Sequence, residues 1–374
     1  MQLSVIILNY NVRYFLEQCV LSVQKALEGI DGEIIVIDNA SSDESCEMMK
    51  TKFPHIKLIE NKENLGFPKG NNIGVAQAKG EYICILNPDT VVAEDTFSKI
   101  LNFQLINHNS QLGIIGCKLI DGAGNFLPES KRGVPTPWVA FTKIFGLYKI
   151  SNYFGKYYAQ HLSENETGKV DILVGAFMVM KRELYLEVGG FDENCFMYSD
   201  DIDLSYLVLK SGKSNYYFHE TSVIHYKGES TVRDGTYMKR FREAMQFFYK
   251  KHFKKSWFFD VMMQVGSFVF SLLKKNQQKN EFRTIDEYVV FSKGNLELNL
   301  SRKATYLSDF NQFENQTQKN LEIIFDTTTF SFAEIITFMQ LNKSKNLSFK
   351  NYISSLNYLI GSNNSNDRGQ IILL

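Results

Sequence analysis

The stretch Ile-Cys-Ile-Leu-Asn-Pro-Asp-Thr occupies residues 83–90 and largely decides the fold. Its four apolar residues predict a buried strand. Pro88 has no backbone donor and biases Asn87 toward extended geometry, so we expect the strand to end there. Ligands of open α/β sheets bind at the carboxyl ends of strands, where a carboxylate can hold a divalent cation and its phosphate. Asp89 is therefore a candidate metal ligand, with a cap on a helix starting near Ala93 as the alternative.

Length and composition describe a globular chain without excess charge. Its 374 residues predict two or three domains, and 44% hydrophobic residues suffice for a core. Lysine plus arginine equals aspartate plus glutamate at 41 each, which argues against a nucleic-acid partner. Five scattered cysteines without CxxC spacing indicate reduced core residues of a cytoplasmic protein. Because no basic segment precedes an apolar core at the N-terminus, we expect no signal peptide.

Strand-like and helix-like stretches alternate along the first part of the chain. Apolar runs typical of strands occupy residues 4–8, 33–37, 57–59, 83–86 and 112–120. Helical periodicity separates them, as at residues 14–27. This alternation predicts an α/β fold, with a doubly wound, mostly parallel sheet and helices on both faces.

Polar loops directly follow three of these strands, at residues 9–11, 38–43 and 87–89. The carboxyl ends of parallel strands share one edge of a sheet, so we expect the loops to gather there. The first loop lacks Gly-x-Gly-x-x-Gly, which argues against a dinucleotide-binding Rossmann domain, and no P-loop motif is present. We therefore expect a metal at Asp89 to hold phosphate.

Small residues mark two further stretches. A loop at residues 61–70 is expected to precede a helix that runs through Ala78. Its glycines would let the backbone approach a ligand near a helix N-terminus, although an ordinary glycine-rich connection is the alternative. Residues 134–167 look like an irregular insertion near the ligand site. A long apolar strand is expected at residues 170–180, where Gly175 is small enough to admit a ligand.

Three carboxylates within four residues, Asp200, Asp201 and Asp203, open a predicted helix. The helix dipole accounts for one or two of them, but adjacent like charges repel. A carboxylate in such a group can act as a general base. His225 ends a predicted strand at residues 222–224. A lone histidine is usually structural, but a position ahead of a glycine-containing loop makes it a candidate ligand.

Seven short motifs, in their order along the chain, resemble those of glycosyltransferase family 2, the inverting GT-A enzymes, and especially its rhamnosyltransferase-like branch. The resemblance covers roughly residues 3–230. The motifs are Ile-Leu-Asn-Tyr-Asn at 7–11, Val-Ile-Asp-Asn-Ala-Ser-Ser-Asp at 36–43, Asn-Leu-Gly-Phe at 64–67, Asn-Pro-Asp at 87–89, Gly-Gly-Phe-Asp-Glu at 189–193, Asp-Asp-x-Asp-Leu at 200–204 and His-x-x-Gly-x-Ser at 225–230. Each motif alone is weak, whereas seven in this order are specific.

The resemblance implies a donor site and a metal site. The donor-binding residues would be Asn9, Asp38, Asn39, Gly66, Asn71 and Asn87. Among them, Asp38 would hydrogen-bond the donor's base. Asp89 takes the last position of the family's Asp-x-Asp motif, which binds Mg²⁺ or Mn²⁺ on the sugar diphosphate. Asn87 stands where many members carry the first aspartate, which leaves one charged ligand fewer. His225 matches a histidine that completes the metal site.

The resemblance also implies the catalytic residues. Asp201 matches the second residue of the family's Glu-Asp pair, which is the catalytic base. Asp200 stands in place of the usual glutamate. An inverting transfer needs one base opposite a leaving group that a metal neutralises, and this set of residues is consistent with that chemistry.

Residues beyond the motifs predict two more parts. Basic and aromatic residues flank an apolar stretch at 261–273, which is shorter than the roughly 20 residues that span a bilayer. The flanks favour a helix in the membrane interface, and a core helix between domains is the alternative. Residues 285–374 look like a separate α/β unit, with strands at 288–291, 323–325 and 358–361 and a helix at 332–341.

The sequence therefore predicts a GT-A glycosyltransferase domain at residues 1–233, a helical, membrane-interfacial segment at 234–283 and a small α/β accessory domain at 284–374. The expected activity is inverting transfer of a sugar, such as rhamnose, from a nucleotide-diphosphate donor to a saccharide or lipid-linked glycan in surface polysaccharide synthesis. A sugar-nucleotide- or glycan-binding module without turnover is the alternative. We expect a cytoplasmic protein with peripheral contact to the cytoplasmic face of the inner membrane.

Overall fold

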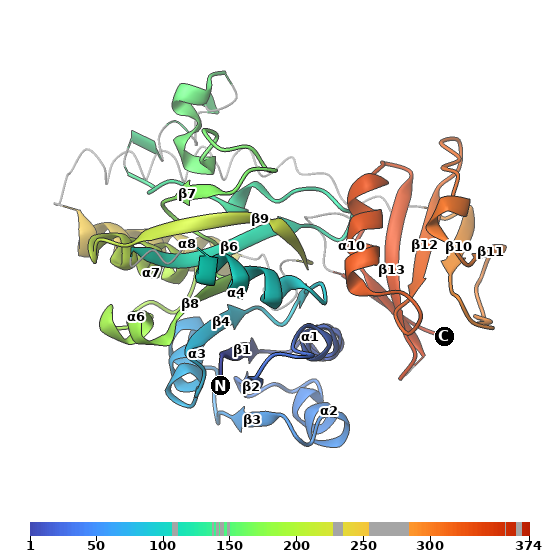
Figure 1. Ribbon diagram of the computed structural model, residues 1–374, viewed down its shortest axis with the longest axis horizontal. Helices are drawn as coiled ribbons and strands as arrows, with labels where there is room; N and C mark the ends of the chain where they lie inside the picture. Colours follow the sequence, from blue (N-terminus) through green and yellow to red (C-terminus); the bar gives the residue numbers. More distant parts are fainter. Residues whose placement is uncertain are drawn as a thin grey trace.

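The computed structural model describes residues 1–106, 111–136, 138–139, 142, 146–147, 150–226, 235–253, 284–355, 357–363 and 369–374. These residues form two sheets with helices packed against them (Figure 1). The predicted interfacial stretch at residues 261–273 lies outside the described residues. Within the described part of the chain, no helix has both the length and the apolar character needed to cross a membrane.

The larger sheet carries the predicted strand ends. In the described residues it has nine strands in the order β3-β2-β1-β4-β8-β6-β9-β5, with β7 paired to β9. The strands are β1 (Leu3–Asn9), β2 (Gly32–Asp38), β3 (Lys57–Glu60), β4 (Tyr82–Leu86), β5 (Thr90–Val91), β6 (Leu112–Ile120), β7 (Gly168–Val170), β8 (Phe177–Lys181) and β9 (Ser214–His225). The pairs β1–β2, β1–β4, β2–β3 and β6–β9 are parallel, whereas β8 runs antiparallel to β4 and β6. The predicted mostly parallel sheet is confirmed.

Helices cover both faces of this sheet. They are α1 (Arg13–Ala26), α2 (Ser45–Lys52), α3 (Gly66–Ala76), α4 (Thr96–Ile106), α6 (Arg182–Glu187), α7 (Asp200–Lys210) and α8 (Gly235–His252), with short 3₁₀ helices η1 (Pro128–Ser130) and η3 (Asn152–Tyr158). Successive side chains of a strand point to opposite faces. Accordingly, Val5 and Ile7 of β1 pack in one core with Leu16 of α1, and Ile6 packs in another with Val75 of α3.

Three sequence predictions about these elements are wrong in detail. Helix α3 begins at Gly66 and includes Pro68, because the first turn of a helix tolerates proline, so the predicted loop at 61–70 ends earlier. The predicted strand at 170–180 is two strands, β7 and β8. Between them the chain turns away, and Ile172 forms an isolated bridge with Arg132. The strand predicted at 222–224 is only the end of the longer strand β9.

The second sheet has six strands in the described residues, in the order β11-β10-β12-β13-β14-β15. They are β10 (Glu287–Phe291), β11 (Ala304–Leu307), β12 (Leu321–Asp326), β13 (Leu347–Ile353), β14 (Tyr358–Gly361) and β15 (Gln370–Leu373), accompanied by helix α10 (Phe332–Leu341) and the 3₁₀ helix η4 (Phe310–Gln312). The three predicted strands and the helix of this unit are present, and β11, β13 and β15 were not predicted. Strands β10 to β13 pair in parallel and the last two pairs are antiparallel.

A shared apolar cluster joins the two sheets, and we call it the interdomain core. From the first sheet it takes Val91, Ile224 and Tyr226, and from the second unit it takes residues such as Phe332 and Tyr358. Helix α10 lies between β9 and the second sheet (Figure 1). The C-terminal unit therefore packs directly against the segments that follow Asp89 and His225.

A carboxylate reinforces this contact. Both oxygens of Glu94, just before α4, accept hydrogen bonds of 2.8 Å from the backbone N–H groups of Phe332 and Ala333. These N–H groups open α10, where they have no partner within the helix and where the helix dipole favours an anion. Glu94 thus caps a helix of the C-terminal unit from the other side of the interface.

Replacing Glu94 by alanine (Glu94→Ala) should lower the free energy of unfolding by about 1–2 kcal/mol, because loss of a helix cap typically costs about 1 kcal/mol and the helix dipole adds to it. Urea-induced unfolding followed by circular dichroism measures the change. Glu63→Ala, which truncates an exposed glutamate, is the matched control. Equal stabilities of the two variants would contradict a capping role for Glu94.

Candidate functional site

The predicted polar strand ends lie at one edge of the larger sheet. In the register of β1 with β2, Asn9 is opposite Asp38, and β4 follows on the other side of β1. The Asn9 amide Nδ2 donates to Asp38 Oδ1 at 2.7 Å and to Ser41 Oγ at 3.1 Å. Asn9 and Asp38 are almost fully buried. The other Asn9 amide atom, Oδ1, is buried and has no hydrogen-bond partner in the described part of the chain.

The start of α3 extends this network. Asn39 Nδ2 donates to the Gly66 carbonyl at 3.1 Å and lies 3.3 Å from Asn64 Oδ1. Asn71 is fully buried and its Nδ2 donates to the Phe67 carbonyl, but its Oδ1 has no partner among the described residues. The predicted donor-binding residues Asn9, Asp38, Asn39 and Gly66 are therefore linked, and Asn71 lies one helical turn beyond Phe67.

Gly66 also has a structural reason to be glycine. Its φ is +81°, in the left-handed region, and a Cβ there would lie 2.8 Å from the Phe196 carbonyl oxygen and from its ring. The Phe67 N–H donates to that same carbonyl at 3.0 Å. The start of α3 is thus held against the loop that leads into α7. Substitution at Gly66 would separate these two segments.

Asp89 and His225 lie together, as predicted. Strand β5 pairs antiparallel with β9 so that Thr90 is opposite His225, and Asp89 Oδ1 lies 3.4 Å from His225 Nε2. Asn87 Nδ2 is also 3.4 Å from this nitrogen. Asp89 does not cap the following helix, since α4 begins only at Thr96 and the Asp89 side chain points to His225. The capping alternative is therefore wrong.

The groups around Asp89 fit a divalent cation. A carboxylate and an imidazole, both more than 90% buried, converge with the partly exposed Asn87 amide. Asn87 Oδ1 and His225 Nδ1 are buried without hydrogen-bond partners in the residues described. Among those residues, no group of three or more His, Cys, Asp or Glu side chains could hold a metal. The protein would thus supply few ligands, as is usual for Mg²⁺ bound together with substrate phosphates.

The three carboxylates of α7 have different partners. Asp201 Oδ2 accepts hydrogen bonds from Arg132 Nη2 at 2.5 Å and from the Gly175 N–H at 3.1 Å. Asp203 instead pairs with Lys251 Nζ at 2.8 Å and His252 Nε2 at 2.5 Å, which fastens α7 to α8. Asp203 therefore has a structural role, and Asp200 and Asp201 are left as the reactive candidates.

Asp200 is the carboxyl group whose protonation the site alters. Burial, and then the charge of neighbouring Asp201, raise the pKa of Asp200 to about 7. The residue two positions earlier, Tyr198, has a φ of +79°, which non-glycine residues seldom adopt. Such backbone strain tends to concentrate at functional sites, where surrounding structure maintains it.

Residues 174–176 connect the two halves of the site. The Asn87 N–H donates to the Ala176 carbonyl at 3.0 Å, and Gly175 contacts Asp201 through its N–H. A Cβ at Gly175 would lie 3.3 Å from Asp201 Cβ and 3.6 Å from the Phe67 ring. Gly175 was predicted to admit a ligand, and in the structure it allows α7, α3 and β8 to approach each other. The structure thus brings the predicted donor-binding and metal-binding residues and the Asp200–Asp201 pair into one region.

Sequence reasoning missed Arg132. This residue lies in an irregular stretch after η1, is 9% exposed and reaches Asp201 across the fold. Its neighbour Lys131 is also buried but donates to the carbonyls of residues 158, 159 and 162. Nothing in the local sequence distinguishes the two cations. Only the structure shows which one contacts the adjacent carboxylates Asp200 and Asp201, which we call the acid pair.

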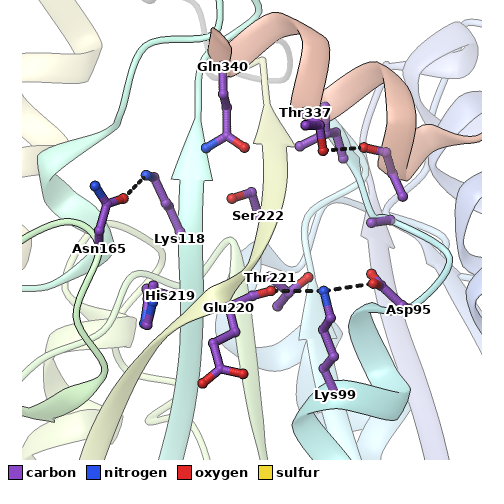
Figure 2. Close-up of a pocket in the computed structure, with 13 residues that line it drawn as sticks. Asp95, Lys99, Lys118, Asn165, His219, Glu220, Thr221, Ser222, Thr337 and Gln340 are labelled. Atoms are coloured by element: carbon purple, nitrogen blue, oxygen red, sulfur yellow. Dashed lines mark hydrogen bonds and ion pairs between the residues drawn. The ribbon is translucent and has the colours of Figure 1, made fainter.

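A separate pocket of about 290 Å³ lies between the larger sheet and α10. Its polar lining includes Lys99, Lys118, His219 and Gln340 (Figure 2). Lys99 Nζ donates to the Glu220 carbonyl at 3.0 Å and pairs with Asp95, and Lys118 Nζ donates to Asn165. No predicted site residue lines it, and its two lysines are already paired within the protein.

Comparison with known proteins agrees with the motifs. The model of glycosyl transferase family 2 matches residues 4–189. N-acetylglucosaminyl-diphospho-decaprenol L-rhamnosyltransferase of Mycobacterium tuberculosis is 26% identical over 243 residues, which are 62% of this chain and 78% of that protein. Poly(ribitol-phosphate) beta-glucosyltransferase of Bacillus spizizenii is 28% identical over 57% of this chain and 33% of that protein. A mannosyltransferase structure from Pyrobaculum calidifontis, in complex with GDP-Man and Mn²⁺, is 18% identical with a TM-score of 0.48, covering 72% of this chain and 69% of that one. Through its N-terminal half, the chain belongs to glycosyl transferase family 2.

Proposed function

We propose that this glycosyltransferase moves a sugar, such as rhamnose, from a nucleotide-diphosphate donor to a saccharide or lipid-linked glycan acceptor, with inversion at the anomeric carbon. The observation that carries the proposal is the joining of two groups by residues 174–176: the Asp89–His225 pair and the Asp200–Asp201 pair. The Mycobacterium tuberculosis relative is named for L-rhamnose transfer and for N-acetylglucosaminyl-diphospho-decaprenol. Its name supports a lipid-linked acceptor and a role in surface polysaccharide synthesis here.

The donor would bind along the polar strand ends. Asp38, held by Asn9, would accept hydrogen bonds from the nucleotide base, with Asn39 beside it. The buried side-chain amide oxygens (Oδ1) of Asn9 and Asn71 have no partner in the described residues, so both can accept a hydrogen bond from the donor. Gly66 and Asn87 complete the assignment by bringing backbone and amide groups close to the donor.

Asp89 and His225, with Asn87, would hold Mg²⁺ or Mn²⁺. When bound, the cation supplies positive charge that neutralises the diphosphate leaving group. Both side chains are more than 90% buried, and a buried carboxylate needs such a partner charge. A histidine holds a metal through a neutral ring nitrogen, so His225 would offer Nε2, the nitrogen that faces Asp89.

Asp201 would be the general base. Its Oδ2 is occupied by Arg132 and Gly175, and among the described residues no hydrogen bond engages its Oδ1. The acceptor hydroxyl oxygen attacks the anomeric carbon while its proton passes to Asp201. The bond from that carbon to the diphosphate breaks with its electron pair on the leaving oxygen. Attack opposite the leaving group inverts the configuration. Asp200, partly protonated near neutral pH, is the second catalytic candidate.

A binding module without turnover is the alternative. The paired arrangement of Asp200 and Asp201 favours the enzyme, because recognition of a sugar nucleotide does not require two adjacent buried carboxylates. Incubating the purified protein with a panel of nucleotide sugars tests both: an enzyme releases nucleoside diphosphate and transfers the sugar, whereas a binding module only retains its ligand.

We also propose the division into residues 1–233, 234–283 and 284–374, which the presence of two separate sheets supports. Basic residues of the middle part and the apolar stretch at 261–273 support peripheral contact with the cytoplasmic face of the inner membrane. A lipid-linked acceptor would be reached from that surface.

Asp89→Ala should reduce transfer on the order of 10²-fold or more, because a metal contributes several kcal/mol to charge stabilisation in the transition state. It should also abolish Mn²⁺ binding measured by electron paramagnetic resonance. Chelator should inactivate the wild type, and added Mn²⁺ or Mg²⁺ should restore it. Asp95→Ala, which removes a surface carboxylate paired with Lys99, is the matched control. Full activity of Asp89→Ala would contradict the metal assignment.

Asp201→Asn should lower turnover by roughly 10²–10⁴-fold, the usual contribution of a general base, while donor affinity survives. Transfer rate and nucleotide-sugar affinity are measured on the same purified variant. A wild-type rate would place the base elsewhere, with Asp200 next. Loss of donor binding would assign Asp201 to the donor site and overturn the mechanism.

The full chain should float with liposomes that contain anionic lipid, and less so at high salt, because each basic residue near the surface contributes about 1 kcal/mol of attraction. Neutral vesicles of the same size are the control. Equal flotation with neutral and anionic vesicles would remove the electrostatic part of this proposal.

A further inference from the structure

A buried arginine contacts the acid pair from outside the helix that carries it. Arg132 is 9% exposed, and its Nη2 donates to Asp201 Oδ2 at 2.5 Å and to the Leu173 carbonyl at 3.0 Å. Its backbone exchanges two hydrogen bonds of 2.9 Å with Ile172. The guanidinium is therefore fixed from both its backbone and its side chain before any substrate binds.

Charges around the acid pair are unequal. Asp200 and Asp201 are adjacent, and Asp203 on the same helix is balanced by Lys251 and His252 of α8. On the side of residues 132–157, Arg132 faces Asp201 and Tyr157 faces Arg132, and residues 173–175 contribute only backbone groups. Arg132 thus contributes one positive charge toward two carboxylates, and it contacts Asp201 directly.

We propose that Arg132 is a positioning residue for the transfer reaction: it keeps Asp201 ionised and fixes Oδ2, which leaves Oδ1 to take the proton of the acceptor hydroxyl. This inference rests on the proposed function. An opposite charge at hydrogen-bond distance favours the charged form of a carboxyl group, whereas burial and a like charge disfavour it. Without Arg132, the buried pair would retain a proton that Asp201 must lose to act as a base.

Of the two carboxyl groups in the acid pair, Asp200 is the one that holds the proton. Burial and the charge of Asp201 raise the pKa of Asp200 to about 7, so near neutral pH Asp200 holds a proton for part of the time. Two neighbouring titratable groups whose environments separate their proton affinities are a general means of assigning acid and base roles. Arg132 makes this separation by contacting only one of them.

The test is the pH dependence of kcat/KM for the acceptor, between pH 5 and 9, in Arg132→Met and Arg132→Lys. Loss of the cation raises the pKa of Asp201, so Arg132→Met should move the acid limb upward by at least about one pH unit and recover activity as pH rises. Arg132→Lys keeps the charge and should leave the limb near its wild-type position. Donor KM should change little in either variant.

Lys131→Met is the matched control, because it removes the neighbouring buried cation, whose contacts are backbone carbonyls. Urea unfolding checks that each variant is folded. If Arg132→Met does not fold, Arg132→Lys decides: an acid limb shifted by one pH unit or more in Arg132→Lys would overturn the proposal.

A double variant supplies a second, independent criterion. If Arg132 acts through Asp201, adding Arg132→Met to Asp201→Asn should cost less than threefold further in kcat. If Arg132 only stabilises the fold, the losses in kcat from the two substitutions should multiply. If the wild type is active and the acid limb of Arg132→Met lies at the same pH as that of the wild type, the inference is overturned. Absence of transfer by the wild type on every nucleotide sugar would instead overturn the proposed function.

Discussion

The pairing of β5 with the end of β9 is the constraint on which the site depends. Strand β5 has only two residues, Thr90 and Val91, and it joins β9 antiparallel at His225 and Ile224. This short ladder brings Asp89 to His225 from distant parts of the chain. Two residues of ladder provide little stability by themselves, because an isolated hairpin is already marginal in water. The interdomain core, which includes Val91, Ile224 and Tyr226, supplies the additional packing.

The sequence predicts those parts of the fold and site that depend on local order. Asn9, Asp38 and Asp89 each follow an apolar run, so strand ends and their common edge could be predicted from hydrophobic patterning. The helix that starts at Asp200 was equally clear, because carboxylates precede an apolar face. Resemblance to a known family then supplied the roles of these residues, which patterning alone does not provide.

Long-range pairings set the limit of sequence prediction. Residues 170–180 are small or apolar except for Asp171, which suits one strand, yet the chain leaves the sheet between β7 and β8, where Ile172 pairs with Arg132. The same pairing places the Arg132 guanidinium at Asp201. Arg132 and Lys131 are chemically similar neighbours, and their different partners follow from tertiary contacts that no local pattern encodes.

The Glu94 cap on α10 has a consequence for how this chain can vary. The interdomain core covers the segments that follow Asp89 and His225, and Glu94 accepts hydrogen bonds from the N-terminus of α10, which packs in that core. A substitution in the core of the second sheet can therefore change the positions of Asp89 and His225 through packing alone. Recombination that exchanges the C-terminal unit must preserve this contact, so the two halves are expected to be inherited as one.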